Sequence, residues 1–274
     1  MIHYKVDNFN CKNATIWVVK DIECRLCNSG ESVVIDKYSK GRIVQDYSGR
    51  YVIAEFEDGK IVRVNKKYIL INLPDVMQKE VIYSMTNATG AVYNINGSDI
   101  PGVTGNVLYE GMLDDGNMKA PLMYRTAEKL YKAEACFLRM GLTIKVYDTY
   151  RPYTVTRYLY EKMLDIAEQH ADVLNRVING FEYSQKWFLA ENASSHNYGA
   201  AIDMTLVDME KNEELEMQTK VHNLSVLSVI DYNNKNANLL ARVMKKNEFS
   251  SLRSEWWHFQ DNESEVAVMD FYIK

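Results

Sequence analysis

Residues 194–203 read Ser-Ser-His-Asn-Tyr-Gly-Ala-Ala-Ile-Asp, and residues 255–258 read Glu-Trp-Trp-His. Together they supply two histidines and two carboxylates: His196, Asp203, Glu255 and His258. A hydrolytic zinc site needs three nitrogen or oxygen ligands, a position left for water, and a further carboxylate that accepts the proton of that water. A lone histidine is more often an ordinary surface or core residue. Because the residue types occur in combination, the two stretches predict a zinc centre with a catalytic base.

The backbone pattern fits this prediction, with one geometric condition. Gly199 allows a tight turn from the loop that carries His196 into a strand that carries Asp203. Glu255 and His258 are three residues apart, and on an ideal strand such residues point to opposite faces. If Glu255 is to reach the metal site, the chain must bend as it enters the last strand.

A third stretch, residues 147–152, reads Tyr-Asp-Thr-Tyr-Arg-Pro. A guanidinium beside a zinc site can hold the oxyanion that develops on an attacked carbonyl. Arg151 is the candidate, and Asp148 is placed to orient it. The alternative interpretation is a purely structural Asp–Arg pair.

The composition is that of a globular protein of one large domain or two smaller ones. The chain has 274 residues, 47% hydrophobic and 25% charged, with a formal net charge of −5. The negative charge argues against nucleic acid as a partner. We expect no transmembrane segment, because no long apolar run is present. The first residues do not resemble a secretory signal. Both a cell-wall or extracellular protein whose signal was removed and a cytoplasmic protein fit this start.

The first part of the chain is predicted to be all-β. Short β-branched and aromatic runs at 15–19, 32–35, 51–56 and 60–64 are separated by glycine turns, and Asp58-Gly59 is typical of a hairpin. Such closely spaced strands favour a small barrel. We place the boundary at Leu73-Pro74-Asp75, which gives a β-barrel domain at 1–73 and a second domain at 74–274.

The second part mixes helices and strands, so the fold class is α+β. We predict helices at 122–140, ended by Gly141, from Pro152 onward and near 237–246. Strands are predicted at 142–147, 200–207 and 256–260.

In this order, the three motifs resemble the zinc D-alanyl-D-alanine dipeptidases and carboxypeptidases, which include the dipeptidases of vancomycin resistance. The resemblance spans roughly residues 80–262. It implies zinc (Zn²⁺) held by His196, Asp203 and His258, Glu255 as catalytic base, and Arg151 as stabiliser of the transition state. It also implies that Ser194 contacts the substrate. The fold expected from it is that of the hedgehog-type signalling domains, which hold zinc similarly, so a non-catalytic zinc-bearing binding module is an alternative.

The close of the first region, residues 58–70, resembles bacterial Src-homology-3-type modules that accompany cell-wall hydrolases. This resemblance implies that residues 1–73 bind a cell-wall polymer. The alternative is a β-subdomain that simply packs on the catalytic part.

One departure from the dipeptidases bears on the substrate. Those enzymes have Met-x-Thr-x-Phe-Asp, whose aspartate holds the free amino terminus of the dipeptide, whereas residues 217–222 here read Met-Gln-Thr-Lys-Val-His. We therefore assign His222 to substrate binding in place of that acid. An imidazole recognises an ammonium poorly, which favours a peptidoglycan stem peptide ending in D-Ala-D-Ala and a D,D-carboxypeptidase. A dipeptidase acting on free D-Ala-D-Ala is the alternative.

Overall fold

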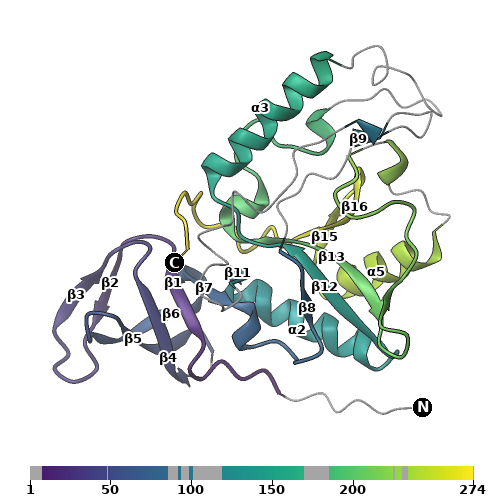
Figure 1. Ribbon diagram of the computed structural model, residues 1–274. Helices are drawn as coiled ribbons and strands as arrows, with labels where there is room; N and C mark the ends of the chain where they lie inside the picture. The colour runs from purple at the N-terminus through teal and green to yellow at the C-terminus, as the bar shows by residue number, and fades with distance from the viewer. Residues whose placement is uncertain are drawn as a thin grey trace.

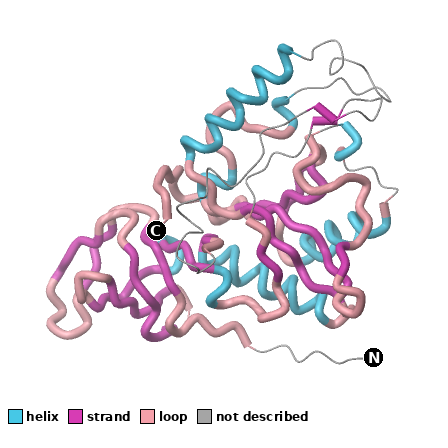
Figure 2. Tube along the Cα trace, viewed as in Figure 1, coloured by secondary structure: helices cyan, strands magenta, loops and turns pink. Residues whose placement is uncertain are grey.

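A computed structural model shows an α+β protein built around two β-sheets (Figures 1 and 2). It describes residues 8–47, 49–85, 92–93, 99–100, 119–169, 185–224, 226–229 and 234–273. None of the helices within these ranges is long and apolar enough to cross a membrane. The expected fold class is thus confirmed for the described chain.

The first sheet is antiparallel and has the order β11-β7-β1-β4-β5-β6. Its strands are β1 (Thr15–Val18), β4 (Lys40–Tyr47), β5 (Tyr51–Phe56), β6 (Ile61–Asn65), β7 (Ile69–Asn72) and β11 (Pro121–Met123). A separate ladder joins β2 (Ile22–Arg25) to β3 (Ser32–Ile35). Residues in β5 and β6 alternate between buried and more exposed positions, so one face of the sheet covers a core. The predicted strands and the hairpin at Asp58-Gly59 are present.

The expected barrel is not confirmed. In the described part of the chain, β11 and β6 remain the two edges of the sheet, and the β2–β3 ladder meets β6 only through an isolated bridge between Leu26 and Val62. The all-β character of the region is therefore observed, whereas its closure and the boundary at residue 73 stay predictions.

The second sheet has the order β15-β16-β13-β12-β8, with β14 added to β13. Its strands are β8 (Ile82–Tyr83), β12 (Leu142–Asp148), β13 (Ala201–Asp208), β14 (Glu213–Glu214), β15 (Ser250–Leu252) and β16 (Glu255–Gln260). A two-stranded ladder pairs β9 (Val92–Tyr93) with β10 (Asp99–Ile100). Of its eight residues, β13 buries the first seven. This central strand lies between β12 and β16.

Helices flank the second sheet. They are α2 (Tyr124–Leu138), α3 (Tyr153–Gln169) and α5 (Lys235–Lys246). Short 3-10 helices are η1 (Lys66–Tyr68), η2 (Leu73–Asp75), η4 (Gln185–Trp187), η5 (Ser195–Tyr198) and η6 (Val226–Ser228). In Figure 1, α2 and α5 lie beside each other against the sheet, while α3 stands apart from them across the sheet.

The predicted helix at 122–140 needs a correction at its start. Residues 121–123 form β11, and the helix begins at Tyr124. In the sequence, the helical spacing of apolar residues extends back to Leu122. In the structure, the main chain at this residue pairs with β7 instead, with Leu122 opposite Ile71. Tertiary strand pairing overrides local propensity at this point. Gly141 follows the helix in the left-handed conformation, with φ 76°, as expected of a residue that ends a helix.

Strand β11 joins the first sheet to the segments that carry the motif residues. It pairs with β7 on one side. The Met123 N–H donates to the Gly199 carbonyl at 2.8 Å, and the Pro121 carbonyl accepts from the Tyr150 N–H at 3.0 Å. One hydrophobic core cluster contains residues of both sheets, including Ile16, Val64, Ile144 and Trp256. The two regions therefore form a continuous packed structure.

We predict that Gly199→Ala destabilises the protein more than Gly141→Ala. Both glycines have positive φ, 64° and 76°, so both substitutions carry the strain of a left-handed non-glycine residue, about 1–3 kcal/mol. A Cβ at residue 199 would also overlap Leu70 Cδ2, whereas a Cβ at residue 141 would meet nothing within 4 Å. Denaturant unfolding measures both losses. Equal losses would contradict the tight contact between β7 and the turn at Gly199.

Candidate metal centre and active site

Strand register brings two of the motif residues together. In the antiparallel pairing of β13 with β16, Asp203 lies directly opposite His258. Residues paired in this way project on the same face of a sheet. His196 lies in η5, which Gly199 ends with a left-handed turn that leads into β13. The turn predicted at Gly199 therefore delivers His196 to the face that already carries Asp203 and His258.

The three predicted ligands converge at one buried point. His258 Nδ1 is 2.9 Å from Asp203 Oδ1, His196 Nε2 is 3.4 Å from the same oxygen, and the two histidine nitrogens are 3.2 Å apart. Tetrahedral zinc bonds of 2.0–2.2 Å place donor atoms about 3.3–3.6 Å apart. Two imidazoles and one carboxylate are also the donor types that zinc prefers. The cluster thus fits a zinc ion in its chemistry, and the donor atoms, 2.9–3.4 Å apart, need to separate by only a few tenths of an ångström to surround one.

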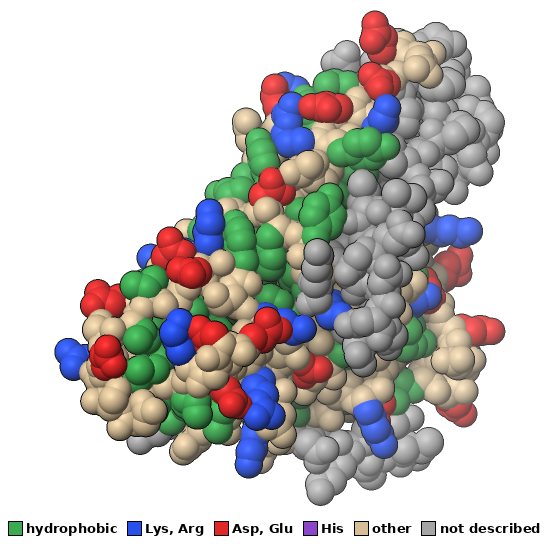
Figure 3. Space-filling view, turned by 60° about the vertical axis from the view of Figure 1, so that its left-hand side comes forward, with side chains coloured by type: hydrophobic (Ala, Val, Ile, Leu, Met, Phe, Trp, Pro, Cys, Tyr) green, Lys and Arg blue, Asp and Glu red, His purple; other side chains and the backbone are tan. Residues whose placement is uncertain are grey.

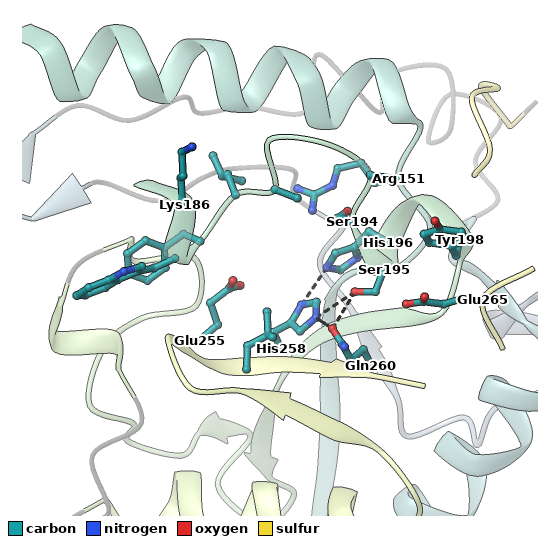
Figure 4. A pocket seen from close by; sticks show the side chains of 16 residues that line it. Arg151, Lys186, Ser194, Ser195, His196, Tyr198, Glu255, His258, Gln260 and Glu265 are labelled. Carbon is teal, nitrogen blue, oxygen red and sulfur yellow. Dashed lines mark hydrogen bonds between the residues drawn. The ribbon is translucent and has the colours of Figure 1, made fainter. Parts of the chain in front are cut away.

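Each histidine of the cluster makes a second contact that sets its tautomer. His196 Nδ1 lies 2.6 Å from the Thr149 carbonyl, which can only accept, so Nδ1 carries the proton and the Nε2 lone pair faces the cluster. His258 Nε2 lies 3.2 Å from Gln260 Oε1 and 3.3 Å from Ser195 Oγ (Figure 4). With the proton on Nε2, the His258 Nδ1 lone pair faces the cluster. Both imidazoles are therefore prepared to bind a metal.

The Asp203 carboxylate also has a partner behind it. Its Oδ2 is 3.0 Å from His222 Nε2, so His222 lies against the ligand cluster. Burial raises the pKa of Asp203, but the imidazole groups of His196, His222 and His258 around it outweigh that effect. The pKa of this carboxyl therefore lies well below its usual range, and Asp203 is an anion at neutral pH.

Glu255 reaches the same cavity because β16 does not continue as an ideal strand. The register with β15 shifts: Leu252 is opposite Glu255, while Ser251 is opposite Phe259. This irregularity supplies the bend that the sequence required. Trp257 Nε1 donates to Glu255 Oε2 at 3.1 Å. Burial raises the pKa of Glu255 to about 8; the attraction of His258 opposes the shift and the negative charge of Asp203 adds to it. A bound dication would lower this pKa, which leaves a carboxylate able to exchange protons near neutral pH.

Arg151 is held rigidly beside His196. Its backbone N–H donates to the His196 carbonyl at 3.1 Å, and its carbonyl accepts from Asn197 Nδ2 at 2.8 Å. The guanidinium Nη1 is 3.6 Å from Asp148 Oδ2, as the sequence motif suggested. Asn197 also donates to Thr156 Oγ1 at 2.8 Å, which fixes η5 against the start of α3. Arg151 is thus buried and oriented at the wall of the site.

A cavity of about 410 Å³ opens at the cluster. Figure 4 shows Arg151 and Glu255 pointing into it from different sides, with His196 and His258 between them. Ser194 lies on its wall, and so do the polar residues Ser195, Tyr198, Lys186, Gln260 and Glu265. His222 is not among the described residues that line the cavity, because it lies on the far side of Asp203.

Sequence reasoning missed three residues that support the ligands. Gln260 could have been found, because it is two residues after His258 on a strand and therefore shares its face. Ser195 is adjacent to His196 but contacts the other histidine. Thr149 acts through its backbone carbonyl, so its residue type could not have predicted that role.

Comparisons with known proteins identify the family of this chain. The D-Ala-D-Ala dipeptidase family model matches residues 104–273. A D-alanyl-D-alanine dipeptidase of Enterococcus faecium is 26% identical over 166 residues, which cover 55% of this chain and 79% of that protein. A D-alanyl-D-alanine dipeptidase of Enterococcus faecalis is 26% identical over 142 residues, which cover 48% of this chain and 68% of the relative.

A solved structure is also similar. It is a variant of the vancomycin-resistance D,D-pentapeptidase VanY from the VanB-type cassette, in complex with Zn(II). It is 14% identical, has a TM-score of 0.33, and covers 65% of this chain and 86% of its own. The assignment rests on the family model, which spans more than half of the sequence. The chain belongs to the D-Ala-D-Ala dipeptidase family and is a zinc metallopeptidase.

Proposed function

We propose that the protein is a D,D-carboxypeptidase that removes the terminal D-Ala from peptidoglycan stem peptides, with zinc held by His196, Asp203 and His258. The observation that carries the proposal is one cavity lined by two of the predicted ligands, His196 and His258, together with Glu255 and Arg151. Buried catalytic groups around one pocket are the expected arrangement of an enzyme, and they speak against a binding module that merely retains zinc.

Each protein group has a distinct part in peptide hydrolysis. Zinc at such a site polarises a carbonyl and lowers the pKa of a water molecule. Glu255 accepts the proton of the attacking water and passes it to the leaving amine. Arg151 donates hydrogen bonds to the oxyanion that develops as the carbonyl carbon becomes tetrahedral. Ser194, on the cavity wall, contacts the peptide.

The carboxylates of the cavity support a substrate longer than the dipeptide. Free D-Ala-D-Ala carries an ammonium close to the scissile bond, and this charge needs an anionic partner when buried. Glu255 and Glu265 are the carboxylates among the described residues that line the cavity. Glu255 is engaged in catalysis, so among these residues a buried ammonium would depend on Glu265. Glu214 is held by Lys145 at 2.7 Å and by the Tyr147 hydroxyl at 2.6 Å. An acylated nitrogen, as in a stem peptide, needs only a hydrogen-bond acceptor.

We predict that mutation of a ligand histidine removes both zinc and activity, whereas mutation of Glu255 removes activity alone. His196→Ala and His258→Ala should lose zinc and activity together, because each removes one of three ligands. Glu255→Gln keeps the shape of the side chain and removes the base, so zinc should stay while kcat falls roughly 10²–10⁴-fold. Zinc is measured by elemental analysis and kcat with a D-Ala-D-Ala-terminated peptide. Full zinc in either histidine variant, or a normal kcat in Glu255→Gln, would refute the corresponding role.

We also predict a preference for the longer peptide. The value of kcat/KM for N-acylated Lys-D-Ala-D-Ala should exceed that for free D-Ala-D-Ala by at least about tenfold, because an unpaired buried ammonium costs several kcal/mol. Glu265→Gln serves as the companion variant and should leave this preference unchanged. A preference for the dipeptide that Glu265→Gln abolishes would instead identify a dipeptidase whose ammonium partner is Glu265.

We propose in addition that residues 1–73 bind a cell-wall polymer outside the cell. A groove of about 400 Å³ on this region supports the idea, since Tyr51, Tyr68 and three cationic side chains line it. Lys20 and Lys67 both lie 4.5 Å from the centre of the Tyr68 ring. The groove also contains Asp21 and Glu23, so its cationic side chains outnumber its carboxylates by three to two, which suits a polymer that carries anionic groups. On the face seen in Figure 3, acidic and basic side chains are interspersed.

The wall-binding prediction is tested in the full chain, because β11 would lose its partner β7 in a protein that starts at Pro74. The double variant Lys20→Gln/Lys67→Gln should sediment less with insoluble sacculi and hydrolyse a small soluble peptide at the normal rate. The control Lys40→Gln/Lys60→Gln makes the same charge change outside the groove. Equal sedimentation of both double variants would refute binding through this groove.

A further inference from the structure

The ligand cluster has an asymmetry that points to a role for His222. The two ligand histidines present N–H groups on their outer sides, and these donate to oxygen acceptors. The outer oxygen of a ligand carboxylate can only accept a hydrogen bond, so it requires a donor instead of an acceptor. His222 Nε2, 3.0 Å from Asp203 Oδ2, is the ring donor that meets this need.

The surroundings of His222 fix its ring in this position. The rings of Tyr147 and Trp257 meet it edge-on, at centroid distances of 6.1 Å and 6.0 Å and interplanar angles of 75° and 86°. Tyr147 comes from β12 and Trp257 from β16, the two strands that flank the Asp203 strand. His222 is therefore held over β13 by both neighbours of that strand, and it is 9% exposed.

The backbone at His222 adopts a conformation that is uncommon for a residue other than glycine. Its φ is 61°, a left-handed conformation that costs a non-glycine residue about 1–3 kcal/mol. Such strain persists when the surroundings over-determine it, and it is frequent at functional sites. Here the conformation delivers the imidazole to Asp203.

We infer that His222 is a positioning residue of the metal centre, which holds the Asp203 carboxylate so that Oδ1 alone faces the two ligand histidines. This rests on the proposed ligand set and changes the expected role of His222 from contact with substrate to support of a ligand. By holding Oδ2 away from the cluster, the hydrogen bond keeps the carboxylate from turning both oxygens toward a metal ion. Partners of this kind typically contribute 10–100-fold to metal affinity.

The test compares His222→Gln with His222→Met. The two side chains have similar length and both lack the ring, so they share the loss of the contacts with Tyr147 and Trp257. Only glutamine keeps an N–H donor that reaches Asp203. Zinc affinity, measured by competition with a chelator, should fall about 10–100-fold in His222→Met and stay within about threefold of the unaltered protein in His222→Gln. The d–d absorption of the cobalt-substituted protein should change in His222→Met alone.

A further control is Tyr147→Phe, which removes the hydroxyl bound to Glu214 and keeps the ring against His222. Its zinc affinity should be unaltered. Unchanged zinc affinity in His222→Met would overturn the inference, and a raised KM in the same variant would then return His222 to substrate binding. The measurement needs no substrate, so it stands apart from the proposed activity. Zinc affinity that survives His258→Ala would instead refute the ligand set.

An observation on the unaltered zinc protein keeps the inference testable even if His222→Met does not fold. Nitrogen-15 correlation spectra should show a proton on His222 Nε2 that exchanges slowly with solvent, because this atom donates within a buried pair. A His222 ring with no proton on Nε2 would overturn the assignment.

Discussion

The antiparallel register between β13 and β16 is the constraint on which the metal centre depends. It places Asp203 opposite His258, and a slip of one residue would turn the side chains of β16 to the other face of the sheet. The same pairing brings Gln260 opposite Ala201, so the residue that supports His258 lies on the correct face as well. One strand pairing therefore fixes the ligands Asp203 and His258 and the supporting residue Gln260. Because seven of the eight residues of β13 are buried, this register is strongly specified.

The first sheet contributes to the site through β11 rather than through a catalytic side chain. β11 pairs with β7 and makes backbone hydrogen bonds to Gly199 and Tyr150, which lie next to the segments of His196 and Arg151. Leu70 of β7 also packs where a Cβ on Gly199 would lie. The position of η5 therefore depends on a region remote from it in sequence. A wall-binding groove on the first sheet would be rigidly connected to the active site.

Polar contacts around the ligands explain why a cluster of buried charge is tolerated. An unpaired buried carboxylate would be expensive, but Asp203 is surrounded by imidazole groups that hold its pKa low. Glu255 has the opposite environment, since burial raises its pKa, the like-charged Asp203 adds to that shift, and the hydrogen bond from Trp257 opposes it only in part. Two carboxylates in one site thus have pKa values displaced in opposite directions. Such a difference separates a ligand, which must stay ionised, from a base, which must exchange protons.

The sequence alone determined the zinc-ligand chemistry, the α+β class and most of the regular strands. Residue type restricts these features: imidazole and carboxylate donors at His196, Asp203 and His258 are unusual together, and alternating β-branched runs are locally specified. Tertiary structure decided the features that depend on pairing between segments distant in the sequence. Examples are β11 in place of the first turn of a helix and the irregular register that turns Glu255 into the cavity. His222 shows the difference most clearly. Alignment with a family motif placed it in the substrate site, whereas its left-handed backbone and the two flanking strands direct its ring to Asp203, and no local pattern encodes that contact.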